Sequence, residues 1–257
     1  MRVFCGWVLA CLIAYGESID IAPQLEIYKM PDTLSQKIDW RGDTQLYASS
    51  LGLWISSENN IYRLDKPSKA LMIPLHVNSF TLAKSGHPIA ILDDQLGVIH
   101  HGLFMPGLKL PMSGYSLTKG PDDTLYLYNT KAAAPIYHFD GKMITPIARP
   151  NEAVVALTHI DTTVIFATKE GVFSLESGKP LGLIMPLPDF APILSISANP
   201  QTAELFLSTR DTVYSLRERL MMPLVTGVGG IVAFYDNSLW IADLERHQIY
   251  IIMPKRP

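Results

Sequence analysis

One unit of sequence recurs six times along this chain, and this repetition constrains the fold more than any other feature. Each copy contains a short apolar run, a polar turn and a second run in which apolar and polar residues alternate. The apolar runs begin at residues 53, 89, 125, 164, 205 and 239, so successive copies are 36, 36, 39, 41 and 34 residues apart. β-Branched and aromatic residues dominate the units, and no long helical pattern interrupts them. A period of this length is typical of propeller blades, and it predicts an all-β, six-bladed β-propeller.

Two further runs in each unit predict that every blade has four antiparallel strands. The repeated triplets are expected to form the second strand of each blade: Leu53-Trp54-Ile55, Ile89-Ala90-Ile91, Leu125-Tyr126-Leu127, Val164-Ile165-Phe166, Leu205-Phe206-Leu207 and Leu239-Trp240-Ile241. Upstream of most triplets lies an almost continuously apolar run, as expected of an inner strand buried on both faces. These inner runs are Phe80–Leu82, Tyr115–Leu117, Val154–Leu157, Ile193–Ile196 and Ile231–Phe234.

A methionine shortly before a proline marks the predicted outermost strand of five units. The pairs are Met72 with Pro74, Met105 with Pro106, Met143 with Pro146, Met185 with Pro186, and Met222 with Pro223. Proline has no N–H to donate and therefore suits an edge strand, while we interpret the methionines as packing between blades.

A sixth pair, Met30-Pro31, stands at the wrong end of the chain. It ends the run Leu25–Met30, whereas the last unit stops soon after Ile249-Tyr250-Ile251 and leaves no room for another hairpin. We therefore expect the N-terminal segment to supply the outer strand of the last blade and to close the ring, because an open ring would expose unpaired strand edges.

The last unit resembles a known repeat. Asn237–Asp243 followed by Arg246–Ile249 is similar to the NHL-type pattern of a turn, an apolar triplet, an aspartate and a later polar-apolar strand. Gly52–Ser56 followed by Asn60–Arg63 is similar, with Ser56 expected where the aspartate would stand. The chain thus resembles the NHL- and TolB-like six-bladed propellers over most of its length. The resemblance implies a fold and no particular activity.

The N-terminus has the pattern of an export signal. Met1-Arg2 is a short basic region, Val3–Ile13 is apolar but too short to span a bilayer, and Ala14-Tyr15-Gly16 is a small-x-small cleavage site. We predict a signal peptide over 1–16, a single propeller domain over 17–257, no integral membrane span, and export to a bacterial periplasm or cell surface. The alternatives are a lipoprotein anchored through Cys11, an uncleaved anchor, and a plain buried N-terminal segment. Both cysteines, Cys5 and Cys11, precede the cleavage site, so a mature chain would have no disulfide.

Composition and motifs exclude several function classes. A net charge of −3 provides no basic face for nucleic acid. No nucleophile elbow, phosphate-binding loop, dinucleotide fingerprint or HExxH motif occurs. We therefore expect no cofactor, no catalytic set and no metal site. The pair Asp93-Asp94 could contribute oxygen ligands to a divalent cation, but turn chemistry explains it equally well.

The loops between the second and third strands of the blades are the candidate binding surface, because loops on a rigid scaffold often carry binding function. Ordinary solvated turns are the alternative. The candidate residues are Glu58, Asn59, Asp93, Asp94, Lys169, Glu170, Arg210, Asp211, Asp243, Arg246 and His247. Their mixed charges favour a polar surface that binds protein or glycan. Because the loops are polar and no catalytic set is present, the leading hypothesis is a non-catalytic scaffold that binds a protein partner within an envelope or secretion assembly. The alternatives are a sensor that binds a glycan or small ligand at the channel mouth, and an enzyme similar to propeller lactonases or lyases, which would need carboxylates or histidines converging on the channel.

Overall fold

The computed structural model describes residues 18–40, 44–50, 52–57, 59–64, 71–176, 179–187 and 192–255. The predicted signal peptide, its cleavage site and the lipidation alternative at Cys11 lie outside these ranges. Export therefore stays a prediction. Within the described ranges, no helix is both long and apolar enough to cross a membrane.

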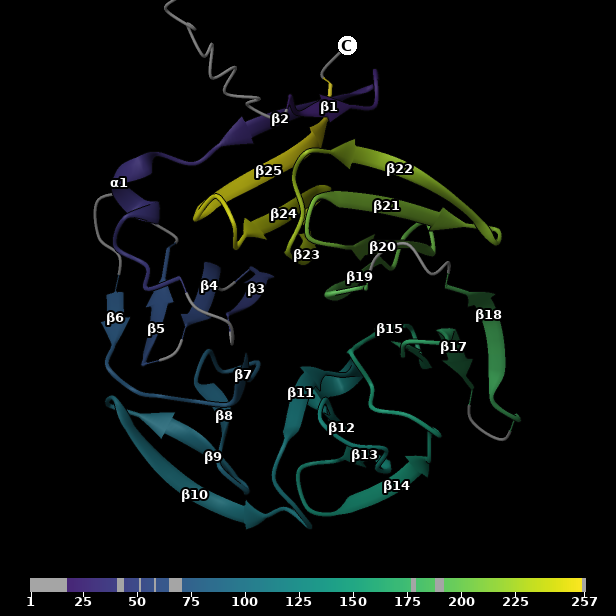
Figure 1. The fold of residues 1–257 in the computed structure, drawn as a ribbon. Helices are drawn as coiled ribbons and strands as arrows, with labels where there is room; N and C mark the ends of the chain where they lie inside the picture. Colours follow the sequence, from purple (N-terminus) through teal and green to yellow (C-terminus); the bar gives the residue numbers. More distant parts are fainter. Residues whose placement is uncertain are drawn as a thin grey trace, which may run out of the picture.

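Six antiparallel sheets are arranged as blades around a central axis, as the repeat predicts (Figure 1). Blade 1 contains β3 (Gln45–Ser49), β4 (Gly52–Ser57), β5 (Asn60–Arg63) and β6 (Leu71–Ile73). Blade 2 contains β7 (Ser79–Leu82), β8 (Pro88–Leu92), β9 (Gln95–His100) and β10 (Leu103–Lys109). Blade 3 contains β11 (Tyr115–Lys119), β12 (Leu125–Asn129), β13 (Ile136–Phe139) and β14 (Ile144–Ala148).

The other three blades repeat this order from the axis outward. Blade 4 contains β15 (Ala156–Ile160), β16 (Thr163–Ala167), β17 (Gly171–Leu175) and β18 (Gly182–Pro186). Blade 5 contains β19 (Ser195–Asn199), β20 (Glu204–Ser208), β21 (Thr212–Arg217) and β22 (Leu220–Thr226). Blade 6 contains β23 (Ile231–Tyr235), β24 (Ser238–Asp243) and β25 (Gln248–Pro254). Helix is confined to α1 (Asp32–Ser35) and the short turn η1 (Pro121–Asp123) in the described residues.

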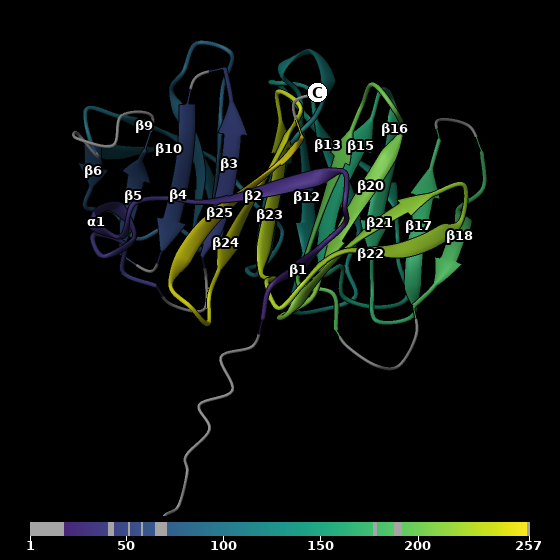
Figure 2. The same cartoon turned by 90° about the horizontal axis from the view of Figure 1, so that it is seen from above.

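The N-terminal segment closes the ring, as predicted. Strand β2 (Leu25–Lys29) pairs antiparallel with β25, with Leu25 opposite Pro254 and Lys29 opposite Tyr250. Strand β1 (Asp20–Ile21), which no pattern in the sequence predicts, pairs with β22 and gives blade 5 a fifth strand. The segment therefore lies across the outer edges of blades 5 and 6 (Figures 1 and 2).

Apolar side chains fill the gaps between neighbouring blades. Six hydrophobic clusters of described residues occur, one for each pair of adjacent blades. Between blades 3 and 4, for example, fully buried Phe166 packs with Tyr126 and Leu157. The repeated triplets supply much of this core, because successive residues of a strand point to opposite faces and so reach both neighbouring blades.

The interpretation of the methionines as core residues was wrong for most of them. Met72, Met105, Met143 and Met222 are 53%, 54%, 64% and 56% exposed, whereas Met185 packs against the core between blades 4 and 5. The blades diverge toward the rim, so no neighbouring sheet covers these outer side chains. The prolines do mark outer strands, and the ladder is irregular beside them: in β10, for instance, the register shifts between Pro106 and Leu108.

Candidate functional site

A channel of about 650 Å³ runs along the propeller axis. Its described lining comes chiefly from the inner strands β3, β7, β11, β15, β19 and β23, one from each blade. Each inner strand begins beside the loop between the second and third strands of its blade, as Gln45 does opposite Ser56. These loops therefore surround one mouth of the channel, which we call the loop face. The turns that join the first strand to the second and the third to the fourth lie on the opposite, hairpin face.

Polar side chains of the inner strands bond to the inner strand of the next blade. We call this set of hydrogen bonds the inter-blade seam. Gln45 Oε1 accepts from Phe80 N–H (3.0 Å), and Ser79 Oγ accepts from Leu117 N–H (3.0 Å). Thr118 Oγ1 donates to the Leu157 carbonyl (3.1 Å). Between blades 5 and 6, Ser195 Oγ accepts from Val232 N–H (3.2 Å) and Ser197 Oγ accepts from Phe234 N–H (2.9 Å). An inner strand has no neighbour on its axial side, so these side chains satisfy backbone groups that would otherwise lack a protein partner.

Replacing Ser195 with alanine is expected to lower the free energy of unfolding by about 1–2 kcal/mol, because it leaves the buried Val232 N–H without its acceptor. Chemical denaturation of the purified protein measures the loss. Ser238→Ala is the matched control, since Ser238 only donates to the Asp236 carbonyl at the surface, and it should change stability by less than about 0.5 kcal/mol. Equal effects of the two substitutions would show that the seam adds nothing to stability.

The described lining of the channel carries positive charge and no carboxylate. Lys119 lies near the hairpin face, where its amine is 3.0 Å from Asp123, and Lys131 lies near the loop face. Partial burial alone would raise the pKa of Asp123, but its contacts with Lys119 and with the Lys84 backbone lower it. Tyr128 also lines the channel, and burial raises the pKa of its phenol to about 12. This phenol is therefore a neutral hydroxyl at physiological pH.

His159 is the histidine among the described lining residues. Its Nδ1 is 3.2 Å from the Asp161 carbonyl, and the ring also hydrogen-bonds to the Lys119 backbone. Burial lowers the pKa of His159 although both of these bonds act in the opposite direction. The imidazole thus connects blades 3 and 4 near the hairpin face, and its nitrogens are engaged by backbone groups rather than by an acid.

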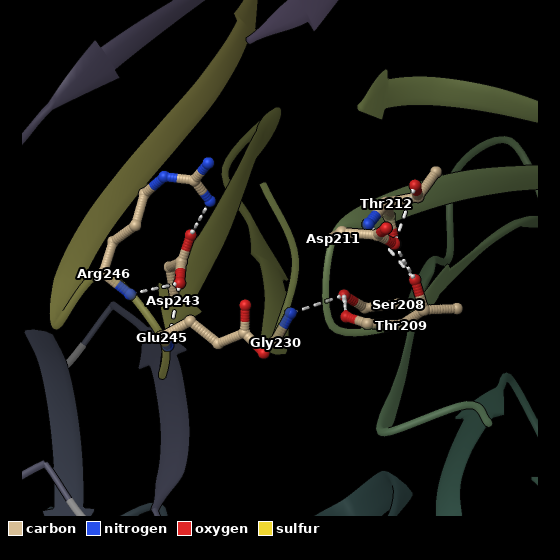
Figure 3. A network of polar contacts seen from close by, with 8 residues as sticks. All are labelled: Ser208, Thr209, Asp211, Thr212, Gly230, Asp243, Glu245 and Arg246. Atoms are coloured by element: carbon tan, nitrogen blue, oxygen red, sulfur yellow. Dashed lines mark hydrogen bonds and ion pairs between the residues drawn. The ribbon is translucent and has the colours of Figure 1, made fainter. Parts of the chain in front are cut away.

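Two of the predicted binding residues, Asp243 and Arg246, interact with each other within their own loop. Asp243 is fully buried, and its Oδ1 accepts from the backbone N–H groups of Glu245 (3.0 Å) and Arg246 (2.8 Å) (Figure 3). Its Oδ2 lies 3.1 Å from the Arg246 guanidinium. The residue equivalent to Asp243 in blade 1 is Ser57, because Trp54 and Trp240 occupy the same strand position. The expectation that Ser56 takes this place was therefore wrong by one residue.

The same capping position recurs around the loop face. Asn129 Oδ1 accepts from Lys131 and Ala132 N–H, Thr168 Oγ1 accepts from Glu170 N–H, and Thr209 Oγ1 accepts from Thr212 N–H. Each of these residues follows or ends the second strand of its blade. The loops are therefore fixed by short polar side chains at their first position.

The other predicted residues are mainly exposed, but the structure brings only some of them together. Arg210 and Glu245 approach to 3.8 Å across blades 5 and 6, and the Trp40 ring stacks on His247 at 6.1 Å. Asp94 pairs with Lys109 at 3.5 Å, so this carboxylate is directed to a neighbouring lysine. Exposed side chains belong to Asn59, Asp93, Lys169, Glu170, Arg210, Asp211 and His247, whereas Glu58 lies outside the described residues. Their role in binding stays a prediction. No group of three His, Cys, Asp or Glu side chains in the described ranges is arranged to hold a metal ion.

Searches against models of protein families and against curated protein sequences find no match. Solved structures do match. A streptogramin B lyase is similar at 17% identity over 82% of this chain and 78% of that chain, with a TM-score of 0.63. A gluconolactonase from Xanthomonas campestris is similar at 9% identity over 79% of this chain and 82% of that chain, with a TM-score of 0.65. A candidate gluconolactonase is similar at 12% identity over 91% and 94% of the two chains, with a TM-score of 0.67.

The likeness is one of fold. It confirms the predicted resemblance to six-bladed propellers of the NHL type. At such low identities it does not transfer an activity, since propellers with different functions share this architecture.

Proposed function

We propose that this protein binds a small polar molecule, uncharged or anionic, in its central channel. The observation that carries the proposal is the channel itself: about 650 Å³, with a described lining of hydroxyl groups, backbone, aliphatic and aromatic residues, one histidine and two lysines, and no carboxylate. A volume of this size is typical of pockets that enclose small ligands. Hydroxyls such as those of Thr158 and Tyr128 can donate and accept, which suits a ligand with several polar groups.

The similar structures support use of the channel by a small molecule, since their names refer to a lyase for streptogramin B and to a gluconolactonase. The titratable groups that line the channel favour binding over catalysis. A lactonase or lyase reaction would need converging carboxylates or histidines, whereas His159 is held by two backbone groups and Lys119 by Asp123. The signal-like residues 1–16 are the ground for proposing that binding takes place in the bacterial envelope.

Thermal unfolding in the presence of sugars, sugar lactones and hydroxy acids tests the proposal. A ligand at about 100 times its Kd should stabilise the protein by about 2.7 kcal/mol. Thr158→Trp places bulk in the channel and should abolish this stabilisation, whereas Thr145→Trp on the exposed outer strand β14 should preserve it. Stabilisation that persists in the Thr158→Trp variant would contradict binding in the channel.

A protein-binding scaffold is the second candidate, favoured by apolar side chains exposed on the outer strands. Leu103 and Met105 in blade 2, and Leu220 and Met222 in blade 5, form two separate pairs that are more than half exposed, and exposed apolar patches can mark protein contacts. Recovery of the same stoichiometric partner by the unaltered chain and not by a Leu103→Lys, Met105→Lys variant would support this second function. Equal recovery by both would exclude the outer face of blade 2 as the contact.

A further inference from the structure

Three histidines lie together on the hairpin face of blade 2, remote from the loop-face residues and on a different element from His159. His87 precedes β8, His100 ends β9, and His101 follows it in the turn to β10. The ring centroids of His87 and His100 are 5.5 Å apart, and those of His100 and His101 are 4.1 Å apart. All three side chains are exposed, so an ion in solution can reach them.

The backbone fixes the first two histidines opposite each other. Strands β8 and β9 pair Ile89 with Val98, and continuing this register by two residues places His87 opposite His100 with both side chains on one face. The His87 carbonyl accepts from Ala83 N–H at 3.0 Å, which holds the turn before β8. On the other side, His101 and Gly102 have φ of 50° and 77°, as in a tight two-residue hairpin turn. The pair is therefore preorganised by two hairpins.

The separation of the rings suits a shared metal ion. A ring nitrogen binds a divalent transition ion at about 2.0–2.1 Å, which puts the centroids of two rings on one ion about 4.5–6 Å apart. His87 and His100 fall within this interval. Neutral imidazole is a common ligand for copper, nickel and zinc ions, and among these Cu²⁺ binds most tightly to a given nitrogen site.

We propose that His87 and His100 form a two-histidine binding site for a divalent transition-metal ion, with Cu²⁺ as the preferred ion. Water completes the coordination, because no third His, Cys, Asp or Glu side chain of the described residues is in place as a ligand. Met105 lies on the same face of the blade, opposite Val98 on the neighbouring strand, and its thioether is exposed. The site is independent of the channel and of any ligand bound there.

The test is a calorimetric titration of the full chain, without a histidine tag, with Cu²⁺ at pH 7.5, combined with electron paramagnetic resonance of the bound ion. His87→Ala and His100→Ala should each weaken binding at this site by about tenfold or more. His76→Ala, the same change at an exposed histidine on the loop between blades 1 and 2, should leave it unchanged. Since all these side chains are exposed, the melting temperatures without metal should stay close to that of the unaltered protein.

The spectrum separates this site from other copper sites on the chain. Nitrogen hyperfine structure from two imidazoles should be present in the unaltered protein and lost in the double variant His87→Ala, His100→Ala. His101→Ala should preserve both affinity and spectrum. Binding that survives in the double variant, or that is lost in His101→Ala alone, would overturn the assignment.

Discussion

Deletion of residues 18–31 is expected to lower the free energy of unfolding by about 5 kcal/mol or more, although the segment looks like a dispensable tail by position. The deletion removes β1 and β2 and exposes the edge of β25. It also removes Ile21, Leu25 and Ile27, which pack against the core between blades 5 and 6. Typical domains are stable by about 5–15 kcal/mol, so the loss is a large part of the total.

Differential scanning calorimetry and size-exclusion chromatography measure this effect. For a chain of this size we expect the melting temperature to fall by about 10–20 °C, with association of the exposed edges. A variant in which residues 24–31 are moved behind Pro257 through a short glycine turn is the matched control. Leu25 lies opposite Pro254, and Lys255 N–H already donates to the Gln24 carbonyl, so β25 and β2 can be joined as an ordinary hairpin. A deletion variant as stable and monomeric as the full chain would show that ring closure depends on other contacts.

Much of this fold can be predicted from the sequence because every blade must pack against two neighbouring blades in the same way. The triplets that begin at Leu53 and Leu239 recur as second strands since each must fill the gaps on both sides of its blade. Closure by β2 can also be predicted from the sequence, because an outer strand is missing from the last blade and an additional strand pattern is present near the N-terminus. Strand β1 cannot be predicted, since its two residues, Asp20 and Ile21, form no pattern.

The exposure of the outer methionines was predicted wrongly for a physical reason. A strand pattern shows which residues share a face, but not whether a neighbouring blade covers that face. Met185 is covered and lies opposite Val172, which is fully buried, whereas Met105 is exposed and lies opposite Val98, which is 44% exposed. Both methionines stand before a proline in the outermost strand of a blade, so their sequence context does not distinguish them.

The candidate site was harder to predict than the fold. The loop residues could be predicted from the sequence. The burial of Asp243 and its role as a cap could not, because a charged residue in a turn is normally expected to be exposed to solvent. The channel is formed by the inner strands of six blades, which lie far apart in the sequence. Ser195 stood inside an apolar run and Ser79 directly before one, and such polar residues are the signal that could have revealed the inter-blade seam. Its bonding partners lie 38 and 37 residues further along the chain, beyond the reach of any local pattern.

Gly230→Ala is expected to cost about 2–4 kcal/mol of stability, because this position combines two demands that alanine cannot meet. Its φ is +122°, which L side chains rarely adopt, and an added Cβ would clash with the Ala242 carbonyl oxygen. Gly230 N–H also donates to the Thr209 carbonyl (2.7 Å) and to Ser208 Oγ (3.0 Å), so the backbone cannot move away without breaking the junction of blades 5 and 6 (Figure 3).

Gly141→Ala tests the backbone strain of a positive φ without the steric clash. Gly141 also has a positive φ, +93°, but a Cβ there would meet nothing within 4 Å. Only the backbone strain applies, and the expected loss is about 1 kcal/mol. Urea denaturation of both variants measures the difference, which is the cost of close approach between the blade connection and β24. If Gly230→Ala lost no more stability than Gly141→Ala, this junction could relax, and the loops that carry Arg210 and Glu245 would not be held in one fixed arrangement.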